Sequence, residues 1–277
     1  MRYGLLTDIH ANLPALRAAV RCLSARGVDR WLCAGDVVGY GPQPNECVAE
    51  LAALDPVCVA GNHELVALGE LSSDRCSRRA RESLDWTRGA LDAGSRRYLA
   101  ALPRTARVPG LVLAHGSLAD PEEYIRRPPQ ASAQLDRLAV EHPEAGVLVL
   151  GHTHRAWLYR HGSGDQPDLG PDGSARLLAG HRYLVNPGSV GQSRQREPRP
   201  LARFALLELS DAGVGGRVDP VGVQFFAVDY DYRAVRGALR GQRLPTDSMH
   251  VRPGRLASVQ RRLRRLPSYL AARRPGG

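Results

Sequence analysis

The sequence predicts an α/β protein, and three observations support this class. Short apolar runs with strand character alternate with stretches of helical periodicity in the N-terminal part of the chain. Several apolar runs end at a small residue followed by Asp, Asn or His. After Gly151 the chain contains only strand-like runs, until one last helical stretch. Strands joined by helices in this way form a sheet with helices packed on it.

The first three strands are each expected where an apolar run ends in polar residues. The predicted strands span residues 2–7, 29–34 and 56–60. Asn12 is expected to cap the helix between the first two strands, with Pro14 in its first turn. Asn45 is expected to cap the next helix, which ends near Leu54. These elements form two strand–helix–strand units.

The middle of the chain is expected to be mainly helical. An arginine-studded stretch from 64 to 102 has helical spacing and predicts an insert that covers one side of a cleft. Pro109-Gly110 marks the turn of a hairpin with strands at 104–108 and 111–114. A polar loop containing Pro128-Pro129 is expected to lead into a helix at 131–141, followed by a strand that ends at Leu150.

The C-terminal part is expected to contain strands and one closing helix. The predicted strands are 156–159, 175–178, 183–185, 203–208 and 221–228, and the helix is 232–240. One domain is therefore predicted over residues 1–245, with the helical insert inside it. Residues 246–277 are predicted to be an arginine-rich C-terminal tail.

Composition narrows the class of protein. The 277 residues carry a formal charge of +10, and all 38 basic residues are arginine because the chain has no lysine. The exclusive use of arginine indicates a general preference for arginine over lysine in the source proteome more than a nucleic-acid surface. The absence of lysine also excludes a Walker A loop, which needs a lysine to reach the phosphates. No apolar run reaches the roughly 18 residues of a membrane span. With no signal-peptide layout and five cysteines without a CxxC pair, we expect a cytoplasmic protein without a membrane partner.

Residues that can bind metal ions follow the predicted strands where each one ends. Residues i and i+2 of an extended chain point the same way, so His152 and His154 converge while Thr153 turns away. In open α/β sheets, ligands bind at the carboxyl ends of strands, so these side chains are expected on one rim. The set contains Asp8, His10, Asp36, Asn62, His63, His115, His152 and His154.

The chemistry of this set favours divalent transition ions. Carboxylate oxygens, an amide oxygen and imidazoles suit Mn, Fe, Co, Ni or Zn better than Ca or Mg. The donors are too many for one ion, so we expect two ions about 3.5–4 Å apart that share a carboxylate. Such a pair lowers the pKa of a bridging water and neutralises phosphate oxygens, which suits hydrolysis of a phosphate ester.

Taken singly, several of these residues could have an ordinary structural role and no part in binding metal. His10 fits a buried structural histidine, Asp36 a turn residue, Asn62 a helix cap and His115 a loop histidine. It is the repetition of the arrangement at five strand ends that favours the metal site.

Five segments resemble the five motifs of the calcineurin-like metallophosphoesterase superfamily, in the family's order. They are Asp8-Ile9-His10, Gly35-Asp36, Gly61-Asn62-His63, His115-Gly116 and Gly151-His152-Thr153-His154. The resemblance covers residues 1–245 and implies a four-layer α/β/β/α sandwich of the metallophosphoesterase type. It also implies a dinuclear site with a bridging hydroxide, in which manganese is the expected ion and iron, nickel, cobalt or zinc are alternatives.

The resemblance assigns roles to single residues. One ion would be held by Asp8, His10, Asp36 and His154, and the other by Asp36, Asn62, His115 and His152, with Asp36 bridging. By the same likeness His63 is no ligand. It contacts the scissile phosphate or protonates the leaving oxygen as a general acid.

Two further segments are similar to a bacterial and archaeal branch of small phosphodiesterases and phosphatases. They run from Gly35 to Pro42 and from Asn186 to Gln192. This branch includes enzymes of the diadenosine tetraphosphate hydrolase kind. The likeness implies hydrolysis of a phosphomonoester, a phosphodiester or a nucleotide phosphoanhydride. Glu64 stands where aspartate is more usual, and Gln43 replaces an acidic residue, but neither is a ligand in the family pattern.

Four residues are candidate substrate contacts, each with an alternative. Gly188 and Ser189 form an ordinary turn, or they offer backbone N–H groups to a phosphate. Tyr40 packs in the core, or it stacks on a substrate ring. Arg194 binds an additional phosphate, or it lies in a solvated loop.

Two other functions fit parts of the sequence. A nuclease would need a long basic groove beside the ions, whereas the densest arginine run lies in the tail, so a nucleic-acid substrate is not favoured. A non-catalytic scaffold, as in the retromer subunit with this fold, predicts lost ligands, and here all are present. Substrate selectivity belongs to the insert and the loops, so the ligand set predicts neither the substrate nor the oligomeric state.

Overall fold

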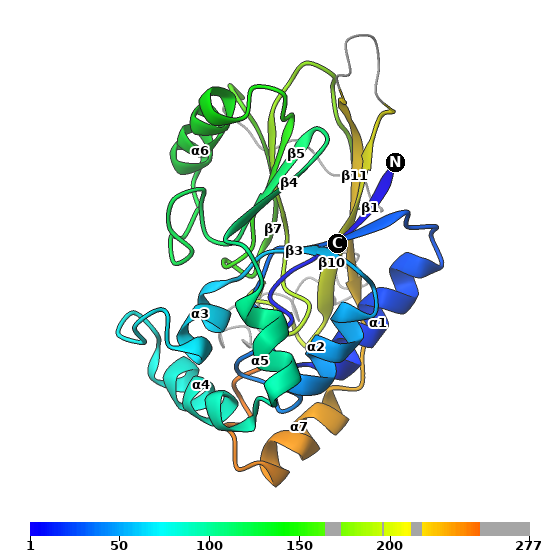
Figure 1. Ribbon diagram of the computed structural model, residues 1–277. Helices are drawn as coiled ribbons and strands as arrows, with labels where there is room; N and C mark the ends of the chain where they lie inside the picture. Colours follow the sequence, from blue (N-terminus) through cyan, green and yellow to red (C-terminus); the bar gives the residue numbers. More distant parts are fainter. Residues whose placement is uncertain (164–172, 196, 212–217, 250–277) are drawn as a thin grey trace, which may run out of the picture.

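The structure, a computed structural model, consists of two β-sheets that face each other, with helices on their outer sides (Figure 1). It describes residues 1–163, 173–195, 197–211 and 218–249. One sheet has six strands in the order β3-β2-β1-β10-β11-β8, and the other has five in the order β4-β5-β6-β9-β7. The four-layer α/β/β/α sandwich predicted from the sequence is confirmed.

The six-stranded sheet contains a parallel half and an antiparallel half. β1 (Arg2–Leu6) is parallel to β2 (Arg30–Cys33), which is parallel to β3 (Val57–Cys58). β10 (Ala202–Leu209) and β11 (Pro220–Val228) extend it in antiparallel pairs, and β8 (Ser174–Arg176) forms the edge. The three parallel strands therefore end at the same edge of this sheet.

The five-stranded sheet begins with the predicted hairpin of β4 (Thr105–Val108) and β5 (Leu111–Ala114). β5, β6 (Val147–Val149) and β9 (Tyr183–Pro187) are parallel neighbours. β7 (Ala156–Arg160) pairs with β9 in the antiparallel direction. The carboxyl ends of β5 and β6 therefore also lie together.

The inner strands are buried on both faces. Successive side chains of a strand point to opposite faces, and in these strands both sets are covered. Leu5 packs between the two sheets, whereas Leu6 packs under the helices outside. In the second sheet, Leu113 faces inward and Val112 packs with the outer helix. This double burial explains why the strands read as continuous apolar runs in the sequence.

Helices α1 (Leu13–Ser24), α2 (Pro44–Ala52) and α7 (Tyr232–Gly241) lie on the side of the first sheet, and α6 (Pro128–Glu141) lies on the second (Figure 1). The Asn12 side chain caps α1 by accepting a hydrogen bond from the Ala15 backbone N–H at 3.2 Å, as predicted.

Two predicted helix starts are wrong. α2 begins at Pro44, and the Asn45 side chain does not cap it. Instead Asn45 donates to the Ala90 carbonyl oxygen at 2.9 Å and accepts from the Asp92 N–H at 3.0 Å, which ties α2 to the insert. α6 starts at Pro128 and not after the loop, because proline is tolerated in the first turn of a helix.

The insert consists of α3 (Asn62–Leu68), α4 (Arg78–Ala90) and α5 (Ala93–Ala100), which lie together at one end of the sandwich (Figure 1). It starts two residues earlier than predicted, because Gly61 and not Asn62 is the N-cap of α3. At the other boundary the chain stays packed past residue 245: Met249 is buried. Residues 250–277 of the predicted tail lie outside the described residues. None of the described helices has the length and apolar character needed to cross a bilayer.

Candidate metal centre

The ends of five strands bring seven polar side chains into one buried cluster. They follow β1, β2 and β3 of the first sheet and β5 and β6 of the second. The cluster therefore lies between the strand ends of two sheets, whereas the sequence analysis expected it on one rim of a single sheet. Each of the seven side chains belongs to a residue that is at most 5% exposed. They are Asp8, His10, Asp36, Asn62, His115, His152 and His154.

The potential ligand atoms form two groups that share one carboxylate. Within each group all atoms lie within 4.8 Å of one another. The first group contains Asp8, His10, Asp36 and His154, and the second contains Asp36, His115 and His152. The Asn62 Oδ1 lies beside the second group, 3.2 Å from the His115 Nε2.

The Asp36 carboxylate lies at the centre of this arrangement. Its Oδ2 is 3.2 Å from the His115 Nε2 and 3.8 Å from the His10 Nε2. This oxygen is buried and has no hydrogen-bond partner among the residues that the structure describes. A buried carboxylate oxygen needs a positive partner, which the nearby His115 ring supplies here and which a bound cation would supply in its place. The donor set therefore fits divalent metal ions.

The histidine ring nitrogens that face away from the cluster each meet a backbone carbonyl oxygen. These contacts fix which nitrogen carries the proton and leave the other one for a metal ion. The contacts are His10 Nδ1 to Val38 O (3.1 Å), His115 Nδ1 to Ala34 O (2.6 Å), His154 Nδ1 to Gln192 O (2.7 Å) and His152 Nε2 to Glu122 O (3.1 Å). His152 is thus held in the opposite tautomer and presents Nδ1.

Burial and charge set the protonation of the histidines. Burial lowers the pKa of His10 and His154, and it lowers the pKa of His152 to about 3, so these rings are neutral as metal ligands must be. Burial would also lower the pKa of His115, but the Asp36 carboxylate outweighs it, with help from Asp8, and raises this pKa to about 10. A cation bound next to His115 would therefore displace its proton.

Five of the seven residues have a left-handed backbone conformation that non-glycine residues rarely adopt. Each such residue costs on the order of 1–3 kcal/mol, and this strain is typical of functional sites. The sharp bends turn the side chains out of the strand direction and into the cluster. The φ angles are 51° at Asp8, 50° at His10, 55° at Asp36, 63° at His152 and 57° at His154.

The small residues noted before the ligands make room for them. A Cβ atom at Gly61 would overlap the Asp36 Oδ1, and one at Gly151 would overlap the Thr7 Oγ1, which donates to Asp8 at 2.9 Å. A Cβ at Gly39 would overlap the His63 Nδ1. Each of these three positions therefore favours glycine, because a side chain of the site lies where a Cβ atom would be.

Glu64 holds two of the ligand loops together, a role that the sequence did not predict. Its Oε2 accepts from the N–H groups of Asp36 and Gly61 at 2.8 Å each, and its Oε1 accepts from the Val38 N–H at 3.1 Å. Burial, together with the nearby Asp36 charge, raises the pKa of this carboxyl to about 7. Its three acceptor contacts fix the backbone on both sides of Asp36.

Replacing Glu64 by Gln is expected to lower Mn²⁺ affinity about 10- to 100-fold, the usual effect of losing a group that supports a ligand. The Gln amide nitrogen cannot accept, so at least one of the three backbone N–H groups loses its partner. Calorimetric titration of metal-free protein with Mn²⁺ measures this. Glu46→Gln, an exposed residue of α2, is the matched control and should bind as the wild type does. Equal affinity in all three proteins would contradict the role of Glu64.

A cavity of about 300 Å³ opens beside the cluster, and His63 lies in its wall. The His63 backbone N–H donates to the Asp36 Oδ1 at 2.9 Å, and its Nε2 lies 4.0 Å from the Asp36 Oδ2. Its Nδ1 is buried and has no hydrogen-bond partner within the described part of the chain. Burial lowers the pKa of His63. The Nδ1 nitrogen is packed against the Gly39 backbone, so a bound molecule would meet the Nε2 side of the ring.

Three further residues of this cavity carried no sequence signal: Arg75, Glu122 and Tyr124. Arg75 Nη1 donates to the carboxylates of Glu122 and Asp120, at 3.0 Å each, and so links the insert to the loop after β5. The Tyr124 ring centre lies 4.0 Å from that of His152. These contacts join segments far apart in the sequence, so no local pattern marks them.

The four candidate substrate residues separate into two pairs. The Gly188 N–H donates to the Asn186 Oδ1 at 3.0 Å, and the Ser189 hydroxyl donates to the Asp8 carbonyl oxygen at 2.8 Å. The Gly188 bond closes the turn itself, and the Ser189 hydroxyl ties the turn to the segment that follows β1. Tyr40 and Arg194, by contrast, line the cavity, and the Tyr40 ring packs 4.8 Å from His10. Arg194 is half-buried and does not lie in a solvated loop.

Comparison with known proteins gives the family to which the chain belongs. Residues 1–212 match the model of the calcineurin-like phosphoesterase superfamily domain. An uncharacterized protein of Methanocaldococcus jannaschii is 27% identical over 248 residues, which cover 87% of this chain and 93% of that protein. The crystal structure of a metallophosphoesterase from Sphaerobacter thermophilus is 32% identical, with a TM-score of 0.71 over 90% of this chain and 96% of its own.

A hypothetical protein of Pyrococcus horikoshii shares the fold at 19% identity, with a TM-score of 0.67 over 90% of this chain and 96% of that protein. The family match covers most of the chain, and the buried Asp and His cluster lies at its strand ends. The chain belongs to the calcineurin-like phosphoesterase superfamily and is a hydrolase that acts on phosphoester bonds.

Proposed function

We propose that the chain hydrolyses a small phosphorylated substrate with two divalent metal ions, of which manganese is the first choice and iron, nickel, cobalt and zinc are alternatives. One observation carries this proposal. Asp36 belongs to both ligand groups, and its buried Oδ2 has no hydrogen-bond partner among the described residues. A carboxylate in such a position fits a bridge between two cations. Asp8, His10 and His154 would complete one site, and Asn62, His115 and His152 the other.

The bound ions would lower the pKa of a water molecule and neutralise phosphate oxygens. The remaining steps fall to side chains of the cavity. Arg194 lies in its wall and brings positive charge to a phosphate group, whereas Arg75 is already paired with Asp120 and Glu122. His63 would protonate the leaving oxygen through its Nε2, since the ring lies in the same wall and its Nδ1 is buried beside Gly39. An approaching phosphate anion would raise the pKa of His63, which burial alone lowers.

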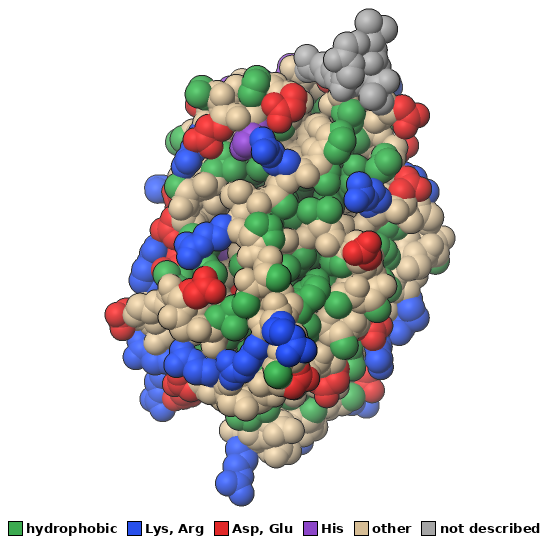
Figure 2. All heavy atoms as spheres, in the orientation of Figure 1, with side chains coloured by type: hydrophobic (Ala, Val, Ile, Leu, Met, Phe, Trp, Pro, Cys, Tyr) green, Lys and Arg blue, Asp and Glu red, His purple; other side chains and the backbone are tan. Residues whose placement is uncertain are grey.

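Three features favour a small substrate over nucleic acid or a scaffold function. The cavity at the metal centre measures about 300 Å³ and is not a long groove. On the face shown in Figure 2, arginines lie in separate groups that are interspersed with acidic side chains. The ligand positions and His63 lie together, which a scaffold would not need.

The five cysteines are free thiols, which supports the expected cytoplasmic location.

Metal removal and replacement test the proposal. Protein stripped with a chelator should not hydrolyse p-nitrophenyl phosphate or its bis ester, and Mn²⁺ should restore activity with saturation near two equivalents, as expected for about two ions per site. A panel of nucleotides, dinucleoside polyphosphates, cyclic nucleotides, DNA and RNA then ranks substrates. Turnover that survives chelation would overturn the metal mechanism. Saturation at one equivalent would overturn the dinuclear site.

A further inference from the structure

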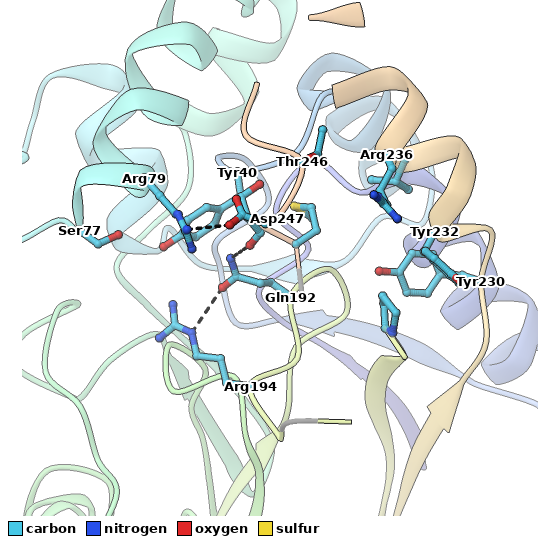
Figure 3. Close-up of a pocket in the computed structure, with 14 residues that line it drawn as sticks. Tyr40, Ser77, Arg79, Gln192, Arg194, Tyr230, Tyr232, Arg236, Thr246 and Asp247 are labelled. Atoms are coloured by element: carbon cyan, nitrogen blue, oxygen red, sulfur yellow. Dashed lines mark hydrogen bonds and ion pairs between the residues drawn. The ribbon is translucent and has the colours of Figure 1, made fainter. Parts of the chain in front are cut away.

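A second cavity adjoins the one at the metal centre, and most of its lining residues have no part in the chemistry described above. Its volume is about 610 Å³, within the range of about 300–1,000 Å³ typical of small-molecule sites. Tyr40, Ser77 and Arg194 line both cavities, so the two meet at these residues. We refer to the larger one as the side cavity (Figure 3).

The side cavity has two walls of different character. Arg194 and Arg79 lie on one side, and Tyr230, Tyr232 and Arg236 lie on the other (Figure 3). The segment 246–249 crosses between the walls. It is held in place by an ion pair of 2.6 Å between Arg79 and Asp247, and by a hydrogen bond from the Gln192 side chain to the Ser248 carbonyl oxygen. Contacts between side chains of the two walls and this segment therefore define the shape of the cavity.

Two arginines of the side cavity are not neutralised by a carboxylate. Within the described ranges, the Arg194 side chain donates to two uncharged groups, the Tyr124 hydroxyl and the Gln192 Oε1, each at 3.4 Å. Arg236 forms no ion pair with any acidic residue in the described ranges, whereas Arg79 is paired with Asp247. Partly buried guanidinium groups without a counter-charge favour an anionic ligand. Arg194 lies where the two cavities meet, so that ligand would reach from one to the other.

The opposite wall offers flat aromatic surface. Tyr230 and Tyr232 come from the junction of β11 and α7, with Val235 one turn further along the helix. Tyrosine rings with polar neighbours bind groups that are flat and apolar on their faces and polar at their edges. A nucleobase has this character, whereas an acyl chain would leave the arginines and the hydroxyl groups unpaired.

We propose that the side cavity binds the nucleoside of a substrate whose scissile phosphate lies at the metal centre. Arg194 then contacts the phosphate at the junction, and Tyr232 and Arg236 hold the nucleoside. This inference rests on the proposed phosphoesterase function and deepens it. It makes nucleoside phosphodiesters better substrates than diesters that carry a small substituent.

Two diesters with the same reporter group test this. They are the p-nitrophenyl ester of thymidine 5′-phosphate and methyl p-nitrophenyl phosphate, which have the same charge at phosphorus. Hydrolysis of either ester bond is followed by chromatography in the presence of Mn²⁺. The kcat/KM ratio of the nucleoside ester to the methyl ester should be about 30 or more, the size expected from burying one aromatic group.

Variants locate the binding site. Tyr232→Ala and Arg236→Ala should each reduce this ratio at least about fivefold, the effect of losing one contact of about 1 kcal/mol. Arg233→Ala is the matched control, because Arg233 is exposed on the same helix and does not line the cavity. It should preserve the ratio. Because each protein is compared on two substrates, a general loss of activity does not change the result.

Each outcome decides a separate question. Absence of Mn²⁺-dependent hydrolysis of both esters would count against the proposed function itself. Hydrolysis of both with a ratio near one would overturn the nucleoside subsite and leave the phosphoesterase intact. A high ratio that persists in Tyr232→Ala and Arg236→Ala would exclude this cavity as the place where the nucleoside binds.

Discussion

Replacing Asp36 by Asn is expected to reduce kcat/KM for bis-p-nitrophenyl phosphate by at least about 1,000-fold, which corresponds to about 4 kcal/mol. The effect is large because Asp36 belongs to both ligand groups, so both ions are affected at once. An Asn side chain removes the negative charge and places an NH₂ group where one carboxylate oxygen stood. Bound metal, measured by elemental analysis after gel filtration, should fall from about two ions per chain to less than one.

The matched control for this variant is Asp136→Asn. Asp136 is exposed on α6, where it pairs with His161 at 2.9 Å, outside both cavities. It should keep wild-type activity and metal content. Thermal unfolding of the Asp36→Asn protein shows whether it is folded. A folded Asp36→Asn protein with wild-type turnover would contradict the central role of Asp36.

Replacing His63 by Gln is expected to lower kcat about 100- to 10,000-fold, the contribution of a general acid, while metal content stays the same. The imidazole lies in the wall of the cavity, and neither metal group includes it. Gln has a similar size and keeps polar atoms at the end of its side chain, but it cannot transfer a proton at neutral pH.

The leaving group distinguishes between the two roles that family likeness allows for His63. If His63 protonates the leaving oxygen, the Gln variant loses more activity on a phenyl ester than on a p-nitrophenyl ester, because p-nitrophenolate needs little protonation. Equal losses on both esters would show that His63 acts on the phosphate alone. Loss of metal from this variant would mean that His63 maintains the centre and does not act in the chemical step.

The parts of the structure that sequence analysis predicted are those with a local pattern. Buried strands have continuous apolar runs, and the chain direction at their ends places the following polar residues at one edge. For this reason sequence analysis could place Asp8, Asp36 and His115 among the candidate ligands. The four-layer arrangement came from family resemblance, because apolar runs alone do not reveal that strands divide between two sheets.

The parts that sequence analysis missed depend on contacts between distant segments. Asn45 has the chemistry of a cap, but its side chain bonds Ala90 and Asp92 of the insert instead. Glu64 was noted only as a departure from the family pattern, although its carboxylate joins two ligand loops. Arg75 reaches a loop more than 40 residues away, at Asp120 and Glu122. Such pairs are set by the tertiary fold, and neither partner carries a signal by itself.

Metal positions in a crystal soaked with Mn²⁺ test the account most directly. Anomalous scattering locates the ions independently of catalysis, and it works even if the natural substrate is unknown. Two anomalous peaks are expected on either side of the Asp36 carboxylate, one toward Asp8 and His154 and the other toward His115 and His152. A fully occupied crystal with one peak, or with peaks away from Asp36, would contradict the dinuclear centre proposed for this chain.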